Sequence, residues 1–237
     1  MESKLVAQLR ELGVIQIKGR ERMFEIYHEL LLSWNEKMNL TAITAYNEVV
    51  EKHFLDSLAI VKAVDMRNSK TLIDIGSGAG FPGIPLKIAF PHLQIVLVDS
   101  LEKRISFLNE VINTLNLQDI ISVNGRAEDL AKDERYREQF DLCVSRAVSN
   151  LSTLSEYCLP FVRIGGKFIS YKGKQVDEEV DKGKSSWEML GGELENVVSF
   201  KLPESKEYRA LVVIDKVKAT PVKYPRKVGV PEKRPLK

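Results

Sequence analysis

Short apolar runs alternate with amphipathic stretches through the middle of the chain. The runs are rich in Val, Ile and Leu, which is typical of strands buried in a parallel sheet. In the stretches, apolar positions recur every three or four residues, as on one face of a helix. We expect strands over residues 71–75, 94–98, 120–123, 140–145 and 167–171, and helices over residues 82–90, 102–116 and 151–162. This alternation predicts an α/β fold with a mostly parallel, doubly wound sheet.

The pattern changes after residue 190. Two strand-like runs, 194–200 and 208–214, are joined by a polar turn and have no helix between them. They predict an antiparallel hairpin at one edge of the sheet. The predicted organisation is therefore an N-terminal helical extension (1–66), a sheet domain (67–215) and a C-terminal tail (216–237).

The extension should contain three helical stretches, over residues 4–12, 21–37 and 48–64. In the second stretch, an aromatic and aliphatic stripe at helical spacing should face a core: Phe24, Tyr27, Leu31 and Trp34. His53 lies in the third stretch. As a lone histidine near a helix start, it predicts packing or capping rather than catalysis.

A turn rich in glycine follows the first predicted strand. Gly76, Gly78 and Gly80 alternate directly after a strand that contains Asp74. Glycine lets the backbone turn tightly and approach a ligand without an intervening Cβ. Because open α/β sheets bind ligands at the carboxyl ends of their strands, the turn indicates a nucleoside cofactor. The glycine triplet alone does not separate dinucleotide enzymes from methyltransferases.

The second predicted strand ends in Asp99, about twenty residues past the glycines. A carboxylate at this point is placed to accept both ribose hydroxyls of an adenosyl group. The alternative is a helix N-cap, a role that Ser100 could fill equally well.

Length and composition limit the size of the core and the class of protein. With 237 residues and 44% hydrophobic content, the chain can bury one substantial core. Cys143 and Cys158 have no spacing that suggests a metal site or a disulfide framework, so buried free thiols in a reducing cytoplasm are expected. No apolar stretch suggests a membrane span or an export signal. We expect a cytoplasmic monomer without a metal.

Positive charge gathers in the tail. Residues 216–237 carry eight Lys or Arg against Glu232 alone, so the rest of the chain has a net charge of about −5. Four prolines predict that the tail is extended rather than helical. A basic tail on a mildly acidic body favours contact with a polyanion such as RNA. A solvated tail that only improves solubility is the alternative.

Taken together, several motifs resemble the ribosomal RNA small subunit methyltransferase G family, also called glucose-inhibited division protein B. The resemblance spans nearly the whole chain and rests on residues 34–41, 53–57, 74–83, 98–104, 125–128, 145–148 and 224–231. It implies a class I, Rossmann-like methyltransferase fold with seven strands. It also implies transfer of a methyl group from S-adenosylmethionine to N7 of one guanosine in bacterial 16S ribosomal RNA, free or in the small subunit.

With that resemblance, the expected cofactor contacts are Asp74, Gly76, Ser77, Gly78, Gly80, Phe81, Asp99, Ser100, Leu101, Ala127, Glu128 and Arg146. The expected catalytic residues are Arg146 and Lys172. The expected RNA contacts are Arg126, Lys172, Arg209, Arg226 and Lys227. Arg146 follows the fourth strand, where a guanidinium could bind the cofactor carboxylate, a phosphate or guanine O6. A structural ion pair is the alternative for Arg146.

The predicted chemistry needs no general base, because guanine N7 has a free lone pair and no proton to lose. The Asp/Asn-Pro-Pro-aromatic motif of amine methyltransferases is missing, and Ser145-Arg146-Ala147-Val148 stands in its place. Three other functions stay open: a nicotinamide oxidoreductase, a small-molecule methyltransferase and a non-catalytic RNA-binding protein. The first lacks the Tyr followed four residues later by Lys that a short-chain dehydrogenase would carry.

Overall fold

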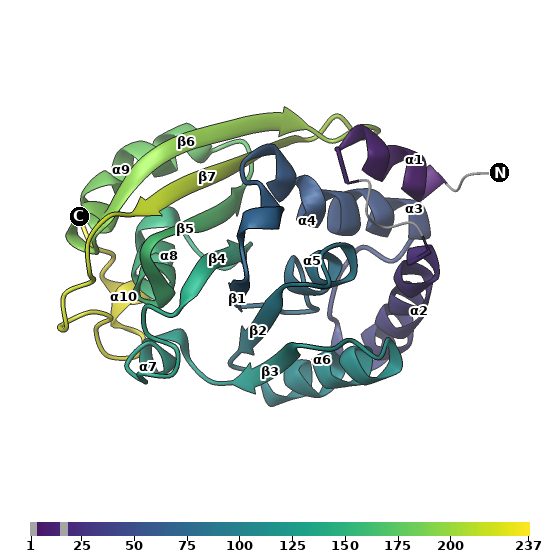
Figure 1. Ribbon diagram of the computed structural model, residues 1–237, viewed down its shortest axis with the longest axis horizontal. Coiled ribbons are helices and arrows are strands. Elements are labelled where there is room, and N and C mark those ends of the chain that lie inside the picture. Colours follow the sequence, from purple (N-terminus) through teal and green to yellow (C-terminus); the bar gives the residue numbers. More distant parts are fainter. Residues whose placement is uncertain (1–3, 15–18) are drawn as a thin grey trace.

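A computed structural model describes residues 4–14 and 19–237 of the chain. Its centre is one seven-stranded sheet with the strand order β3-β2-β1-β4-β5-β7-β6 (Figure 1). The strands are β1 (Thr71–Ile75), β2 (Gln94–Asp99), β3 (Ile120–Asn124), β4 (Phe140–Arg146), β5 (Val162–Lys172), β6 (Gly192–Lys201) and β7 (Tyr208–Lys216). The first five run parallel, and β7 is antiparallel to both β5 and β6. The predicted sheet and hairpin are therefore confirmed.

Helices cover both faces of the sheet. Alternate residues of each strand point to opposite sides, and both sides are apolar, so each face needs a covering layer. Leu72 belongs to one buried apolar cluster and its neighbour Ile73 to the other. The helices packed with Leu72 include α1 (Lys4–Glu11), α2 (Glu21–Met38), α5 (Gly83–Ala89) and α6 (Glu102–Thr114). Those packed with Ile73 include α7 (Ala127–Leu130), α8 (Leu151–Cys158) and α9 (Val176–Met189). Helix α9 was not predicted from the sequence.

The N-terminal extension packs on the sheet domain through the predicted stripe. Phe24, Tyr27 and Leu31 are fully buried, and the Trp34 ring lies 5.7 Å from the Phe107 ring of α6. Trp34 is partly buried and packs against the core. Residues 1–3 and 15–18 of the predicted extension lie outside the described residues.

In place of the single helix predicted over residues 48–64, the structure has four short helical segments of different type that follow one another without a break. They are α3 (Tyr46–Val49), the π-helix η1 (Val50–Leu55), α4 (Asp56–Leu58) and the 3₁₀ helix η2 (Ala59–Lys62). Further 3₁₀ turns are η3 (Met66–Asn68) and η4 (Leu159–Phe161). A π-helical turn is rare in proteins and is frequent at functional sites, and here it carries His53.

The C-terminal tail packs on the domain. It contains the short helix α10 (Val230–Lys233), so the prediction of an extended tail without helix is wrong at this point. Tyr224 and Pro231 are buried, and α10 lies against α8 (Figure 1). The proline at the second position of α10 is compatible with a helix because the first turn needs no N–H from it.

Candidate active site

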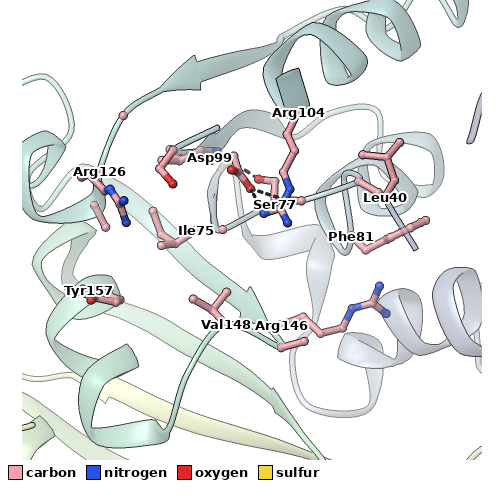
Figure 2. Close-up of a pocket in the computed structure, with 18 of the residues that line it drawn as sticks. Leu40, Ile75, Ser77, Phe81, Asp99, Arg104, Arg126, Arg146, Val148 and Tyr157 are labelled. Atoms are coloured by element: carbon pink, nitrogen blue, oxygen red, sulfur yellow. Dashed lines mark hydrogen bonds and ion pairs between the residues drawn. The ribbon is translucent and has the colours of Figure 1, made fainter. Parts of the chain in front are cut away.

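A cavity of about 450 Å³ opens at the carboxyl edge of the parallel strands. Its lining includes the last residues of three strands, Ile75, Asp99 and Arg146, and it continues just after β3 at Gly125. This is the edge where open α/β sheets bind their ligands. Figure 2 shows Arg126 and Tyr157 at one end of the cavity and Phe81 with Arg146 at the other.

The glycine turn forms the floor of the cavity and is pinned to β2. The backbone N–H groups of Gly76 and Ser77 both donate to the carbonyl of Val98, over 2.9 and 3.0 Å. The Ser77 hydroxyl accepts a bond from the Val98 N–H at 3.1 Å. Gly78 has a φ of +59°, and a Cβ placed there would meet only one atom, the Gly76 carbonyl oxygen at 3.9 Å. The turn therefore presents bare backbone to the cavity.

Asp99 faces the same space. Its side chain is 3% exposed, and its Oδ2 accepts bonds from the Gly78 N–H at 3.0 Å and the Arg104 guanidinium at 3.1 Å. Oδ1 accepts the Leu101 N–H at 2.9 Å. Asp99 is not the helix N-cap considered as the alternative, because Leu101 holds that position before α6 without a side-chain cap bond. The Asp99 carboxylate lines the cavity.

Asp74 lies beneath the turn, although a direct cofactor contact was predicted. It is fully buried, it accepts the Gly83 N–H at 3.0 Å, and it is not part of the cavity lining. Its other oxygen, Oδ1, has no hydrogen-bond partner among the described residues. Burial raises the pKa of this carboxyl to about 7. Its observed position supports the start of α5.

Two more of the predicted contacts lie outside the lining. A Cβ at Gly80 would touch Ile84 and Tyr27, so this glycine allows close packing under the turn. Leu101 begins the connection to α6 with an exposed side chain. By contrast, the predicted residues that do line the cavity are Gly76, Ser77, Gly78, Phe81, Asp99, Ser100, Ala127, Glu128 and Arg146.

The end of the cavity beyond β3 is built from α7 and α8. Ala127 and Glu128 are buried in the first turn of α7, and Tyr157 faces them from α8. Burial and the nearby Glu128 raise the pKa of Tyr157 to about 12, so the phenol keeps its proton. Oε1 of Glu128 accepts the backbone N–H of Gly229 at 2.9 Å. A buried carboxylate with one occupied oxygen can accept a further hydrogen bond from a ligand.

The other end holds a buried ion pair. Arg146 Nη1 lies 2.9 Å from Asp56 Oδ2, and its guanidinium lies over the Phe81 ring, 5.1 Å from the centroid. Asp56 also lies 3.4 Å from Arg209 Nε. Burial raises the pKa of Asp56, and the two guanidinium groups oppose that shift. Arg146 therefore makes the ion pair considered as its alternative role and lines the cavity as well.

His53 belongs to this end, a position that was not predicted from the sequence. Its ring stacks on Phe81 at 4.5 Å between centroids, and Nε2 lies 2.9 Å from the Thr41 hydroxyl. Burial, together with the charge of Arg146, lowers the pKa of His53 to about 4. The histidine is therefore neutral at physiological pH. The signal in the sequence was its place in a motif of residues 53–57, since a lone histidine indicates little by itself.

Other lining residues were not predicted either. They are Leu40, Thr41, Arg104, Ala147, Val148 and Tyr157, among others. Leu40 and Thr41 come from the loop after α2, so the N-terminal extension contributes directly to the cavity. Val148 packs over the glycine turn, where a Cβ on Gly76 would come within 2.5 Å of it.

Lys172, a predicted catalytic residue, lies outside the cavity lining. Its Nζ donates to the Ser149 carbonyl at 2.7 Å and pairs with Glu179 at 2.7 Å. The same Glu179 carboxylate accepts the Leu151 N–H at 2.8 Å. Lys172 thus fixes the loop after β4, which carries Val148 to the cavity.

The predicted RNA contacts differ in their surroundings. Arg126 and Lys227 are exposed, Arg126 at the rim of the cavity and Lys227 on the tail. Arg209 pairs with Glu207 and Asp56. Arg226 is bound by the fully buried Glu156, so its guanidinium holds the tail in place. A phosphate contact by Arg226 would have to compete with that pair.

Within residues 4–14 and 19–237, no group of three or more His, Cys, Asp or Glu is placed to hold a metal ion. Both cysteines are buried and free of disulfides. Burial raises the pKa of the Cys143 thiol, which argues against a thiolate nucleophile there. No helix in these parts of the chain is long and apolar enough to cross a membrane.

The sheet order and the cavity at its carboxyl edge define the class I methyltransferase fold. The fold is similar to that of an O-methyltransferase from Bacillus cereus solved in complex with S-adenosylhomocysteine, with a TM-score of 0.57, 19% identity and coverage of 81% of this chain and 90% of that one. It is also similar to a putative O-methyltransferase from Klebsiella pneumoniae, with a TM-score of 0.56, 14% identity and coverage of 83% and 90%.

Sequence comparison gives the family. The family described as rRNA small subunit methyltransferase G matches residues 20–209. A relative of that name from Lachnoclostridium phytofermentans is 52% identical over 234 residues, which cover 99% of this chain and 97% of the relative. Another, from Alkaliphilus metalliredigens, is 48% identical over 239 residues and covers both chains completely. The chain belongs to the rRNA small subunit methyltransferase G family, as its motifs predicted.

Proposed function

We propose that this chain transfers a methyl group from S-adenosylmethionine to N7 of one guanosine in bacterial 16S ribosomal RNA. The observation that carries the proposal is the cavity itself. Two buried carboxylates line it, Asp99 at the end of β2 and Glu128 in α7 just after β3. The guanidinium of Arg146, paired with Asp56, lies at the opposite end of the cavity. The family membership supports a ribosomal RNA substrate.

The residues present suit the cofactor. Asp99 offers oxygens to the ribose hydroxyls, and Glu128 offers one to a base amine. Gly78 leaves open space where any side chain would intrude on the cavity. When bound, S-adenosylmethionine supplies an electrophilic methyl group on a positively charged sulfur.

The chain's own residues would then bind and orient the base. N7 of guanine has no proton to lose, so alignment and exclusion of water matter more than base catalysis. Phe81 and the neutral His53 give this end an apolar, stacked surface. Arg146 can donate to guanine O6 and leave N7 free, and Asp56 balances its charge. Transfer carries a positive charge from sulfur to the base, so no net charge need be taken up.

RNA phosphates would meet exposed cations around the cavity. Arg126 lies at its rim, and Lys227 lies on the tail close to the bond between Gly229 and Glu128. Phosphate contacts supply much of the affinity of such complexes and make it depend on salt. These roles, a monomeric state and action in the cytoplasm are parts of the same proposal.

The experiment offers the purified protein a radiolabelled methyl donor together with naked 16S RNA, small subunits or a metabolite extract. We expect label in RNA, and 7-methylguanosine as the labelled nucleoside after digestion and mass spectrometry. An Asp99→Ala variant is the matched control for cofactor-dependent label. Label confined to small metabolites would favour the small-molecule methyltransferase. A different labelled nucleoside would overturn the N7 assignment.

A further inference from the structure

The chain after β7 returns to the cavity as a strap, defined here as residues 217–234. It crosses the end of the domain next to α8 and ends in α10 (Figure 1). At its closest approach, the Gly229 N–H donates to Oε1 of Glu128 over 2.9 Å. A cavity residue is therefore held by a backbone group that lies 101 positions further along the chain.

Several buried contacts fix the strap before and after Gly229. The guanidinium of Arg226 binds both oxygens of Glu156, with Nε to Oε1 at 2.9 Å and Nη2 to Oε2 at 2.6 Å. The Arg226 backbone N–H adds a third bond to Glu156 at 2.7 Å. Because Glu156 is fully buried, this bidentate pair has one geometry and little freedom to exchange with water. On the other side of Gly229, the Pro231 carbonyl accepts the Thr153 hydroxyl at 3.3 Å.

Further contacts tie the first half of the strap to the sheet. Arg137 donates to the carbonyls of Thr220 at 2.8 Å and Tyr224 at 3.0 Å. At the end of β7, the buried Lys216 donates to the Thr220 hydroxyl at 2.8 Å and pairs with Glu138 at 2.9 Å. The position of Gly229 is thus set by the whole path of the strap and not by its own bond to Glu128.

The bond matters because of where Glu128 lies. Its residue exposure is only 3%, yet it lines the cavity opposite Tyr157. A buried carboxylate needs hydrogen-bond donors to stay in place, and the Gly229 N–H occupies one of its oxygens. The carboxylate is then held in one orientation with its second oxygen left for a ligand donor. Without the strap, Glu128 would lose this donor and could rotate out of its position.

We propose that the strap is part of the cofactor site, with the Gly229 amide as a positioning group that orients Glu128 toward the bound cofactor. The proposal rests on the function proposed above, in which Glu128 accepts a hydrogen bond from the adenosyl group. It assigns the tail a role in cofactor affinity, in addition to any contact that its exposed cations make with RNA. The chemistry at Arg146 lies at the other end of the cavity and should not depend on it.

The test uses two truncations of the full chain that differ in the Gly229 contact. Residues 1–227 keep the pair of Arg226 with Glu156 and lack Gly229, whereas residues 1–234 keep both. We expect the shorter form to bind S-adenosylhomocysteine about tenfold more weakly by calorimetry, because it lacks a hydrogen bond to a carboxylate. KM for the methyl donor should rise by a similar factor, and kcat should change less than twofold. The longer form should match the complete chain within twofold.

A double-mutant cycle separates positioning from general stability. In a Glu128→Ala background, loss of residues 228–237 should weaken binding by less than twofold further, because the group to be positioned is gone. An equal loss in both backgrounds, or none in either, overturns the proposal. If the 1–227 form does not fold by circular dichroism, full-length Arg226→Lys takes its place in the cycle, because it keeps a charge beside Glu156 but loses the bidentate pair that holds the strap. Gly229 itself is left unaltered, since its φ of +76° would strain any other residue. Should the complete chain fail to methylate RNA at all, the proposed function fails and the effect of the strap on cofactor binding is still measured.

Discussion

The backbone N–H of Gly78 donates to Oδ2 of Asp99 over 3.0 Å, so the turn after β1 and the end of β2 form one unit. This hydrogen bond joins the loop after β1 to the end of the neighbouring strand β2 at the floor of the cavity. It explains how two motifs that are about twenty residues apart present their backbone and carboxylate groups to one ligand. The same carboxylate also accepts the Leu101 N–H, which fixes the direction of its second oxygen.

Replacement of Asp99 should therefore weaken cofactor binding in two ways. Asp99→Ala removes the acceptor for the ribose and also frees the Gly78 and Leu101 N–H groups. Loss of charge-assisted hydrogen bonds of about 1.5–3 kcal/mol predicts a rise of roughly tenfold to a hundredfold in the Kd for S-adenosylhomocysteine. Isothermal titration calorimetry measures it.

Lys103→Gln is the matched control for Asp99. It also removes one charge near the turn, but Lys103 is exposed and does not line the cavity. Its Kd should stay within a few-fold of the unaltered chain. Equal losses in the two variants would mean that charge near the turn, and not the acceptor, controls binding.

Arg146→Lys should lower kcat at saturating methyl donor by roughly tenfold to a hundredfold, since an oriented charge-assisted contact is worth about 1.5–3 kcal/mol. Lysine lacks the planar fork that lets Arg146 lie over Phe81 while it binds Asp56. Single-turnover methylation of RNA gives the rate. Arg163→Lys alters an exposed arginine that pairs with Asp141, and its rate should not change. A normal rate for Arg146→Lys would limit Arg146 to a structural ion pair.

Arg126→Ala should weaken RNA binding and flatten its salt dependence. Removal of one phosphate contact reduces the slope of log K against log salt by roughly 0.7 to 0.9. Filter binding at four salt concentrations measures the slope. The control is Arg135→Ala, because Arg135 is also exposed but lies by the amino ends of β1 and β2. A slope that falls as much for Arg135→Ala would show non-specific attraction alone.

Asp74 should make the unfolding free energy of the cofactor-free chain depend on pH. The ordinary pKa of the carboxyl is 3.8, and burial raises it to about 7 in the folded chain. Between these values the folded state binds the extra proton, so stability falls as pH rises, by at most about 1.4 kcal/mol per pH unit. Asp74→Asn keeps an acceptor for Gly83 and should lose that slope in urea titrations from pH 4.5 to 7.5.

His53 should contribute a slope of the opposite sign. Its ordinary pKa of 6.5 falls to about 4 on folding, so the unfolded state binds the extra proton between these values and stability rises with pH. The two slopes partly cancel in the unaltered chain, so single variants are needed to reveal each. His53→Gln should make stability decline more steeply with pH, and Asp74→Asn less steeply. Identical profiles for all three chains would contradict both assignments.

Periodicity and turn chemistry were sufficient for most of the fold. Apolar runs such as Thr71–Ile75 are buried on both faces, and that requirement is visible in composition alone. The helix α9 was missed because its sequence is highly charged and only Val176, Gly183, Ser186 and Trp187 are buried. The prolines of the tail predicted an extended chain, yet Pro231 stands at a helix start, where proline is tolerated.

For the site, the sequence by itself determined which groups stand at the carboxyl ends of the strands. These are the glycine turn after the first strand, Asp99 at the end of the second and Arg146 at the end of the fourth. Their residue types and their places at strand ends are visible in the sequence, but the partners of Asp99 and Arg146 lie 21 and 90 positions away in the chain. Only the tertiary structure decided that Lys172 fixes a loop, that His53 meets Phe81, and that Gly229 reaches Glu128. Such contacts join segments far apart in the chain, and no local propensity encodes which buried charge will find which distant partner.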